Sequence, residues 1–105
     1  MNEALQQLPL RIEAQKLEKA AFILKAIGHP IRLAILDLLD QTNQMHVSEL
    51  QEKLDIEQAL LSHHLIKMKD KGVLLAVKKG KYIYYSIADP SMIRIIDCIA
   101  QCKAL

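Results

Sequence analysis

The spacing of apolar residues changes along the chain, and each spacing predicts one type of element. From residue 10 to residue 27 apolar side chains recur every three or four positions, which predicts an amphipathic helix that begins at Pro9. Residues 30–40 are apolar around most of a helical circumference, so we expect this second helix at the centre of the core. Further helical patterns cover residues 47–54, 58–71 and 90–104.

Strand patterns appear once, between the last two of these helices. Residues 73–77 and 82–87 are rich in Val, Ile, Leu and Tyr, and the polar residues 78–81 between them predict a hairpin turn. Gly72 is suited to the left-handed position that ends the preceding helix. The predicted fold is therefore mainly α with a small β-hairpin, in the order α-α-α-α-β-β-α.

The helices at residues 47–54 and 58–71 are separated by a tight turn at Asp55 and Ile56. His46 lies near the N-cap of the first helix, and Glu49 is placed to reach back to it as in a capping box. A short helix, a tight turn and a second helix are typical of a helix-turn-helix, here over residues 46–71. The hairpin, predicted over residues 73–87, makes it a winged helix-turn-helix.

In such a unit the N-terminal residues of the second helix reach the base edges in the major groove. The predicted base-reading residues are Gln58, Leu60, Ser62 and His63. Gln pairs with adenine, Ser and His donate to guanine or phosphate, and Leu60 is suited to a thymine methyl group. The alternative is that the three polar residues only solvate an exposed helix face.

The charge of the chain is uneven. The formal net charge is +2 over 105 residues, yet residues 63–81 carry six lysines and one aspartate, a local net charge of +5. A basic segment on an otherwise mildly acidic chain is typical of a surface that binds phosphates. The predicted phosphate-binding residues are Lys67, Lys69, Lys78, Lys79 and Lys81. The alternative for the hairpin lysines is that they prevent edge-to-edge strand pairing.

Composition narrows the class of protein. The length predicts one domain over residues 1–105, and no apolar run approaches the ~20 residues of a membrane span. The N-terminus lacks the basic start and apolar block of a signal peptide, so we expect a cytoplasmic protein. No phosphate-binding glycine loop, nucleophile elbow or zinc-protease motif is present, so neither an enzyme nor a bound cofactor is expected.

Three segments resemble the ArsR/SmtB family of bacterial winged-helix repressors. They are LKAIGHPIRLAILDLL, VSELQEKLDIEQALLSHHLIKMKDKGVL and KKGKYIYYSI, and together they cover about residues 20–90 without a gap. The most specific positions are Gly28, His29, Pro30 and Arg32, then Ser62, His63, His64 and Leu65, then Gly72, Tyr84 and Tyr85.

The resemblance implies a homodimer built from the first and last helices, here residues 1–28 and 90–105. It also implies binding to a short inverted repeat in promoter DNA and release by an inducer. Arg32 would be a structural residue in the helix packing. A rival interpretation from another class is a protein-interaction module, in which the lysines serve only solubility.

The chain departs from the metal-sensing members of the family. Where arsenic and lead sensors have Cys-Val-Cys, this chain has His46, Val47 and Ser48. At the positions of the last-helix zinc, cobalt and nickel site, it has Asp89, Ser91, Cys102 and Leu105. Neither set completes a site, so no metal is predicted from the family pattern.

Cys98 and Cys102 are four residues apart in the predicted last helix, and three interpretations remain open. They are core thiols, or a redox switch that forms a disulfide across the dimer, or a soft-metal or arsenite site completed by a partner chain. The inducer is therefore unknown, with an oxidant and a soft metal as candidates.

Overall fold

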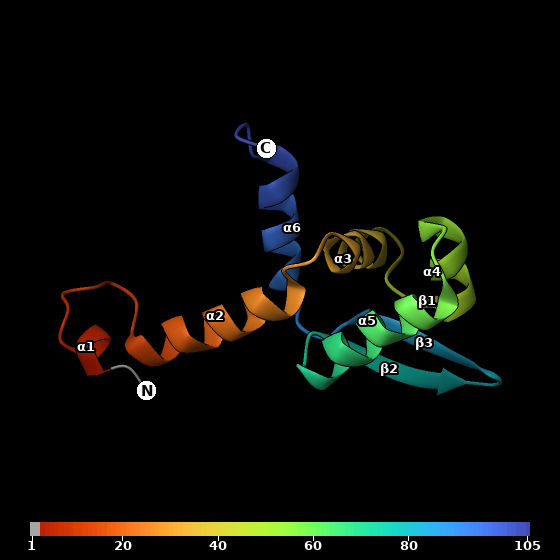
Figure 1. Ribbon diagram of the computed structural model, residues 1–105, viewed down its shortest axis with the longest axis horizontal. Coiled ribbons are helices and arrows are strands. Elements are labelled where there is room, and N and C mark those ends of the chain that lie inside the picture. The colour runs from red at the N-terminus through yellow and green to blue at the C-terminus, as the bar shows by residue number, and fades with distance from the viewer. Residues whose placement is uncertain (1–2) are drawn as a thin grey trace.

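The helices and strands follow the predicted order, with a short helix and a short strand added. The computed structural model describes residues 3–105. Its elements are α1 (Glu3–Gln6), α2 (Ala14–Ile27), α3 (Pro30–Thr42), β1 (Met45–His46), α4 (Val47–Leu54), α5 (Gln58–Asp70), β2 (Leu74–Lys79), β3 (Tyr82–Ile87) and α6 (Met92–Gln101) (Figure 1). None of the helices in this described part is long and apolar enough to cross a membrane.

Two predicted helix boundaries in the N-terminal half are wrong. The long helix α2 begins at Ala14 and not at Pro9, because Glu13 has extended backbone angles and the chain before it turns. Helix α3 continues past Asp40 to Thr42, whose hydroxyl donates to the carbonyl of Leu38. Asn43 then ends it with a φ of 72°, a conformation that Asn tolerates better than most residues.

The last helix is also shorter than predicted, spanning Met92–Gln101 instead of residues 90–104. At its start, the carboxylate of Asp89 accepts a hydrogen bond from the backbone N–H of Ser91, so these residues form a turn. At its end, Cys102 adopts extended angles and leaves the helix.

The strands form a three-stranded antiparallel sheet in the order β1-β3-β2. Lys79 pairs with Tyr82, so a two-residue turn at Gly80 and Lys81 joins β2 to β3. The positive φ of Gly80, 62°, permits this tight connection, which places Lys78 and Lys79 in β2 and not in the turn. Strand β1 had no sequence signal of its own. It pairs Met45 with Tyr85 and thereby joins the hairpin to α4.

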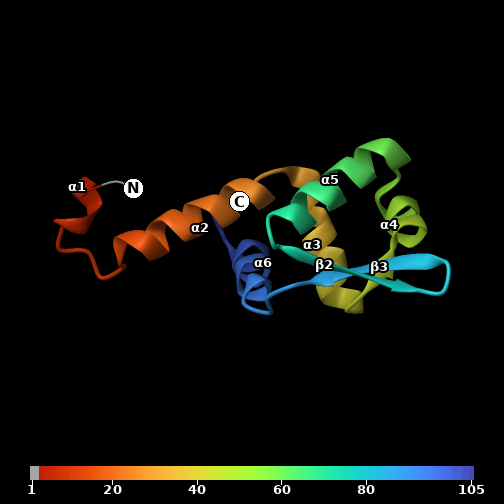
Figure 2. The same cartoon turned by 90° about the horizontal axis from the view of Figure 1, so that it is seen from below.

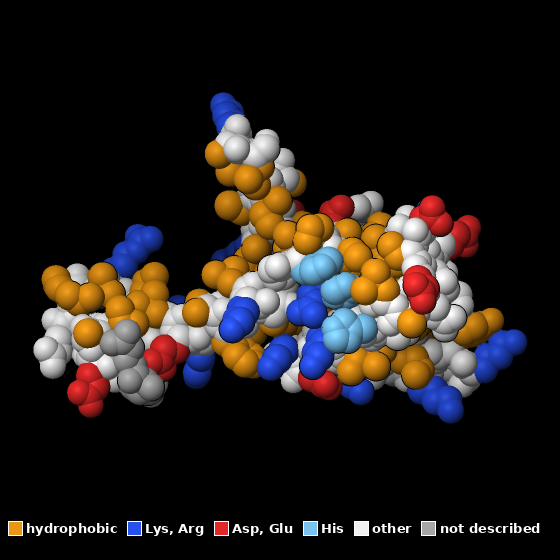
Figure 3. Space-filling model, in the orientation of Figure 1, with side chains coloured by type: hydrophobic (Ala, Val, Ile, Leu, Met, Phe, Trp, Pro, Cys, Tyr) orange, Lys and Arg blue, Asp and Glu red, His pale blue; other side chains and the backbone are white. Residues whose placement is uncertain are grey.

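Helix α2 projects away from the rest of the chain in both views, and α6 projects away from it in Figure 1 (Figures 1 and 2). Figure 3 shows apolar side chains running along both. Phe22 and Leu24 on α2 and Ile99 on α6 are all more than a third exposed. These two helices therefore offer uncovered apolar surface, and so do the strands of the hairpin, where Leu75, Val77 and Ile83 are about half exposed.

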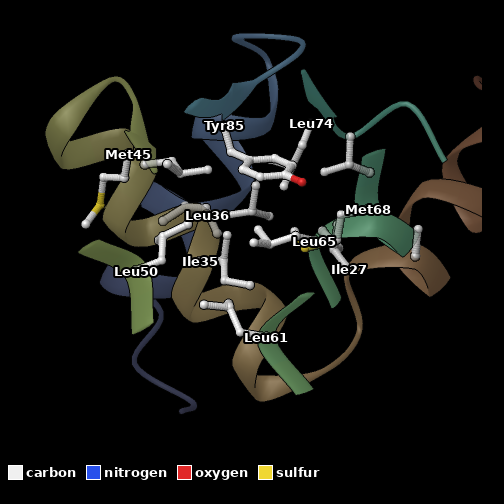
Figure 4. Close-up of a cluster of buried hydrophobic side chains, with 14 residues drawn as sticks. Ile27, Ile35, Leu36, Met45, Leu50, Leu61, Leu65, Met68, Leu74 and Tyr85 are labelled. Carbon is white, nitrogen blue, oxygen red and sulfur yellow. The ribbon is translucent and has the colours of Figure 1, made fainter. Parts of the chain in front are cut away.

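The core is aliphatic and centred on α3, α5 and the sheet (Figure 4). Its fully buried side chains are Ile27, Ile35, Leu36, Leu39, Leu50, Leu61, Leu65, Met68, Val73 and Leu74. Of the three tyrosines, Tyr85 is the one packed into this core. The buried stripe of α5 fixes which side of that helix faces outward.

A polar contact inside this packing joins α3 to α5. His64 is only 4% exposed, and its Nδ1 accepts a hydrogen bond of 3.0 Å from Nε of Arg32. A terminal nitrogen of the same guanidinium donates to the carbonyl of Ala26 at 2.8 Å. The ring of His29 lies 4.4 Å from that of His64, centroid to centroid. Arg32 is thus the structural residue that the family resemblance implies, and it connects α2, α3 and α5.

This environment disfavours the charged form of the His64 imidazole. Burial lowers the pKa of His64 below its usual value of 6.5, and the positive charges of His29, Arg32 and His63 lower it further. Because Nδ1 accepts from Arg32, the single proton of the neutral ring is on Nε2. A second proton would have to displace the Arg32 bond.

The stability of the fold should therefore fall as the pH is lowered. Above about pH 7 His64 is neutral in both states; as the pH falls through 6.5 the unfolded chain binds a proton that the folded chain excludes. We expect His64→Gln to lower the free energy of unfolding at pH 7.5 but to flatten its decline towards pH 5. Urea unfolding across this pH range measures both effects.

His63→Gln, at the neighbouring exposed histidine, removes only the smallest of the contributions that lower the pKa of His64, so this matched control should keep most of the wild-type pH dependence. An equally steep decline in the His64→Gln variant would contradict the assignment of the pH dependence to His64.

Candidate nucleic-acid interface

The turn between α4 and α5 places the second helix across the first. Asp55 adopts left-handed angles, with a φ of 51°, and its backbone N–H donates to the carbonyl of Gln51 at 2.8 Å. Asp is one of the few residues apart from Gly that tolerates this conformation. The tight turn predicted at Asp55 and Ile56 is therefore present, and it ends α4 where the sequence predicts.

The predicted base-reading residues all lie outside the buried stripe of α5, but not on one line. Gln58, Leu60 and His63 are exposed and Ser62 is half-buried. Ser62 lies four residues after Gln58, so these two share a face. Leu60 is about 200° around the helix from Gln58, on the opposite flank. The structure brings Gln58 and Ser62 together and separates Leu60 from them.

Two further residues of this surface were missed by the sequence reasoning. Ala59 and Ile66 are exposed, with Ile66 at 51%, and both lie opposite the buried stripe. Because they are apolar, nothing in their type distinguishes them from core residues. The sequence could have indicated their exposure only through their angular position around the helix, which is opposite to that of Leu61, Leu65 and Met68.

The lysines at the end of α5 also diverge. Lys67 and Lys69 are both exposed, yet two residues of helix place them about 200° apart. Both are in the last turn, where positive charge also stabilises the helix dipole. Neither faces the centre of the outer surface: Lys67 lies on the flank of Leu60, and Lys69 lies on the flank of Gln58 and Ser62.

The three hairpin lysines are not equivalent. Nζ of Lys79 donates to Oε1 of Gln44 at 2.9 Å and lies 5.4 Å from the ring centroid of Tyr84. Nζ of Lys81 lies 5.5 Å from the ring centroid of Tyr82. Lys78 is exposed and points to the other face of its strand from Lys79, because side chains alternate. All three remain at the hairpin end, but two of them also contact the hairpin itself.

His46 packs against the part of β3 that is near the turn of this hairpin. Its ring stacks on Tyr82 at 4.4 Å between centroids and meets the edge of Tyr84 at 5.4 Å. Its backbone N–H donates to Oε1 of Glu49 at 3.1 Å, which is the reach-back contact that the sequence predicts. The hairpin and the start of α4 are thereby held together.

The two thiols do not belong to the core of the described chain. Cys98 lies on α6 and Cys102 just beyond it, and both are exposed. The interpretation as core thiols is therefore wrong for the single chain. Among residues 3–105, no three His, Cys, Asp or Glu side chains are grouped closely enough to hold a metal ion.

Comparisons with known proteins agree with this geometry. Residues 29–74 match the family described as bacterial regulatory protein, arsR family. An uncharacterized HTH-type transcriptional regulator of Methanocaldococcus jannaschii is 40% identical over 87 residues, covering 83% of this chain and 98% of that protein. The transcriptional repressor PagR of Bacillus anthracis is 38% identical over 89 residues, covering 85% of this chain and 89% of PagR.

Solved structures of related proteins have the same fold as this chain. The crystal structure of PagR superposes with a TM-score of 0.76 at 37% identity, covering 83% of this chain and 99% of that one. The solution structure of a homodimeric winged helix-turn-helix domain, Mb0332 of Mycobacterium bovis, superposes with a TM-score of 0.72 at 27% identity, covering 89% and 85%. The predicted winged helix-turn-helix is confirmed, and the chain belongs to the ArsR family of transcriptional regulators.

Proposed function

We propose that this chain is a homodimeric repressor that binds a short inverted repeat in promoter DNA. The observation that carries the proposal is the fixed orientation of α5, whose buried stripe leaves the surface around Gln58, Ser62 and His63 turned outward beside the lysine-tipped hairpin. We call that hairpin, residues 74–87, the wing. A protein with this role is a regulator and not an enzyme, and it works in the cytoplasm.

Specific roles follow from residue chemistry. Gln58 would pair with adenine, and Ser62 and His63 would donate to guanine or to phosphate. Leu60 on one flank and Ile66 at the centre of the outer surface are suited to thymine methyl groups. Lys67, Lys69, Lys78, Lys79 and Lys81 would bind phosphates and position the protein without reading sequence.

The proposed dimer interface comprises residues 1–28 and 90–105, of which residues 1–2 lie outside the described part. Its support is the apolar hollow of 520 Å³ between α2 and α6, lined in part by Ala20, Ile23, Leu24, Met92 and Ile95. Mb0332, the homodimeric relative, has the same fold. A dimer would place two copies of α5 in successive major grooves, about 34 Å apart. Residues 46–71 would then contact the bases of one half-site, and the wing would contact the DNA phosphates beside that half-site.

The wing and α5 should contribute differently to DNA binding. We expect the triple change of Lys78, Lys79 and Lys81 to Ala to weaken binding to all duplexes alike. The salt slope, which is the slope of log affinity against log salt concentration, should become smaller in magnitude by about 1 for each phosphate that the wing no longer neutralises. The measurement is fluorescence anisotropy at several salt concentrations, with a duplex selected from a random pool and an unselected duplex. The matched triple change to Arg keeps the charge and should keep the affinity.

Gln58→Ala with Ser62→Ala should instead reduce the ratio between selected and unselected duplex, by roughly 10-fold or more. Equal losses of affinity on both duplexes would remove the base-reading role of these residues. Exposed Leu60 and Ile66 also suit a protein partner, so failure to select any duplex would favour the protein-interaction module instead.

We also propose that the exposed thiols of Cys98 and Cys102 respond to an oxidant or a soft metal. Both are accessible to solvent in the single chain, and α6 belongs to the proposed dimer interface. A disulfide between two chains, or a shared arsenite site, would alter the spacing of the two α5 helices and so lower DNA affinity.

If the thiols sense such a signal, diamide or arsenite should release the wild-type chain from the selected duplex. Cys98→Ser with Cys102→Ser should abolish the release while leaving the affinity without either reagent unchanged. If the double variant is still released by either reagent, only the thiol proposal is overturned, and the DNA-binding proposal remains.

A further inference from the structure

A cationic hollow lies where α2, α3 and the end of α5 meet. Its volume is 310 Å³, and it is lined by Phe22, Lys25, Ala26, Arg32 and Lys71. Figure 3 shows Lys, Arg and His side chains gathered over this junction, away from the lysines of the wing. The volume is at the lower end of the range for small-molecule sites. Phe22, Lys25 and Ala26 lie in the proposed dimer segment 1–28, but they do not line the apolar hollow between α2 and α6 that supports the dimer.

The charge of its lining is one-sided. Lys25, Arg32 and Lys71 come from three different elements, and no carboxylate lines the hollow. None of these three cations forms an ion pair with a carboxylate of the described residues. Like charges that converge around a partly enclosed space repel one another, and a bound anion would relieve that repulsion. The lining of the hollow therefore favours a negatively charged ligand.

Arg32 has hydrogen-bond donors left for such an anion. A guanidinium carries five N–H groups, and the described contacts use one to His64 and one to the carbonyl of Ala26. The remaining three have no partner among the described residues. A carboxylate or phosphate group matches the planar geometry of these donors.

The lining also provides an apolar surface. Phe22 is 51% exposed, and Nζ of Lys71 lies 5.0 Å from the centroid of its ring. An aromatic or branched apolar group of a ligand could pack on this ring while its negative charge faces the cations. A bare inorganic anion would leave the ring uncovered.

We propose that the hollow binds a small organic carboxylate with an aromatic or apolar group, and that the bound anion weakens DNA binding. The first part is independent of the function proposed above, and the second part rests on it. Arg32 holds His64 of α5, and Lys71 is the C-cap residue of that helix. A negative charge bound there lowers the positive potential near the DNA-binding helix, so ligand and DNA oppose each other.

Benzoate titrated into the DNA-free chain, followed by NMR, tests the first part, with uncharged benzamide as the control ligand. We expect saturable shifts of the Phe22, Lys25, Arg32 and Lys71 signals with a Kd on the order of 1 mM or tighter, and none with benzamide. Lys25→Ala with Lys71→Ala should weaken benzoate binding at least 10-fold, as should the two corresponding changes to Gln. Lys16→Ala with Lys19→Ala, on the same helix α2, should leave it unchanged.

Equal shifts with benzamide, no saturable shifts in the hollow, or unchanged binding in both lysine double variants would overturn the site. The second part predicts that saturating benzoate raises the Kd for the selected duplex about five-fold or more. The Lys25 and Lys71 double variants remove positive charge from the same place, so they should bind that duplex more weakly without benzoate and should lose the further weakening by benzoate. A benzoate effect of full size in these variants would overturn the second part. A salt slope that falls by about 1 for each lysine removed would show instead that the hollow is a DNA-phosphate site, and the second part would be wrong.

Discussion

The structure depends on a single constraint, which is that α5 can expose only one side. Leu61, His64, Leu65 and Met68 are buried along the other side, and a shift of the helix by one residue would bring polar groups into the core. The hydrogen bond from Arg32 to His64 also fixes the rotation of α5 about its axis, because the buried Nδ1 of His64 has to face the guanidinium of Arg32. The outward surface is therefore fixed before any ligand binds. A rigid element of this kind is what a base-reading site requires.

The wing depends on a second, smaller anchor. His46 stacks on Tyr82 and pairs through the backbone with Tyr84, while Lys79 reaches back to Gln44. The hairpin is consequently tied to the start of α4, which leads through one tight turn into α5. The proposed gripping and reading surfaces are thus parts of one framework, although their lysines and polar residues face in several directions.

Much of this fold could be predicted from residue types with strong local preferences. Gly72 and Asp55 mark the ends of α5 and α4 because their backbones are left-handed, and the bounds of α4 agree with the sequence pattern. The start of α2 was wrong because the apolar spacing begins before Ala14, where the backbone is not helical. Strand β1 could not be predicted, since two residues carry no periodicity and their pairing depends on distant Tyr84 and Tyr85.

The candidate site was predictable in part. Residue type made Gln58, Ser62 and the lysines candidates. Only the positions of the buried side chains around α5 show that Ile66 lies at the centre of the outer surface and Leu60 on a flank. The Arg32–His64 contact and the cationic hollow join residues far apart in the chain, so their geometry requires the folded structure. Family resemblance identified Arg32 as structural without naming its partner.

Amide hydrogen exchange of the chain, free and bound to the selected duplex, tests the central claim most directly. We predict slower exchange on binding in the first two turns of α5 and at the tip of the wing, with α4 and the far end of α2 unchanged. Protection confined to α2 and α6, with α5 and the wing unaffected, would contradict the account.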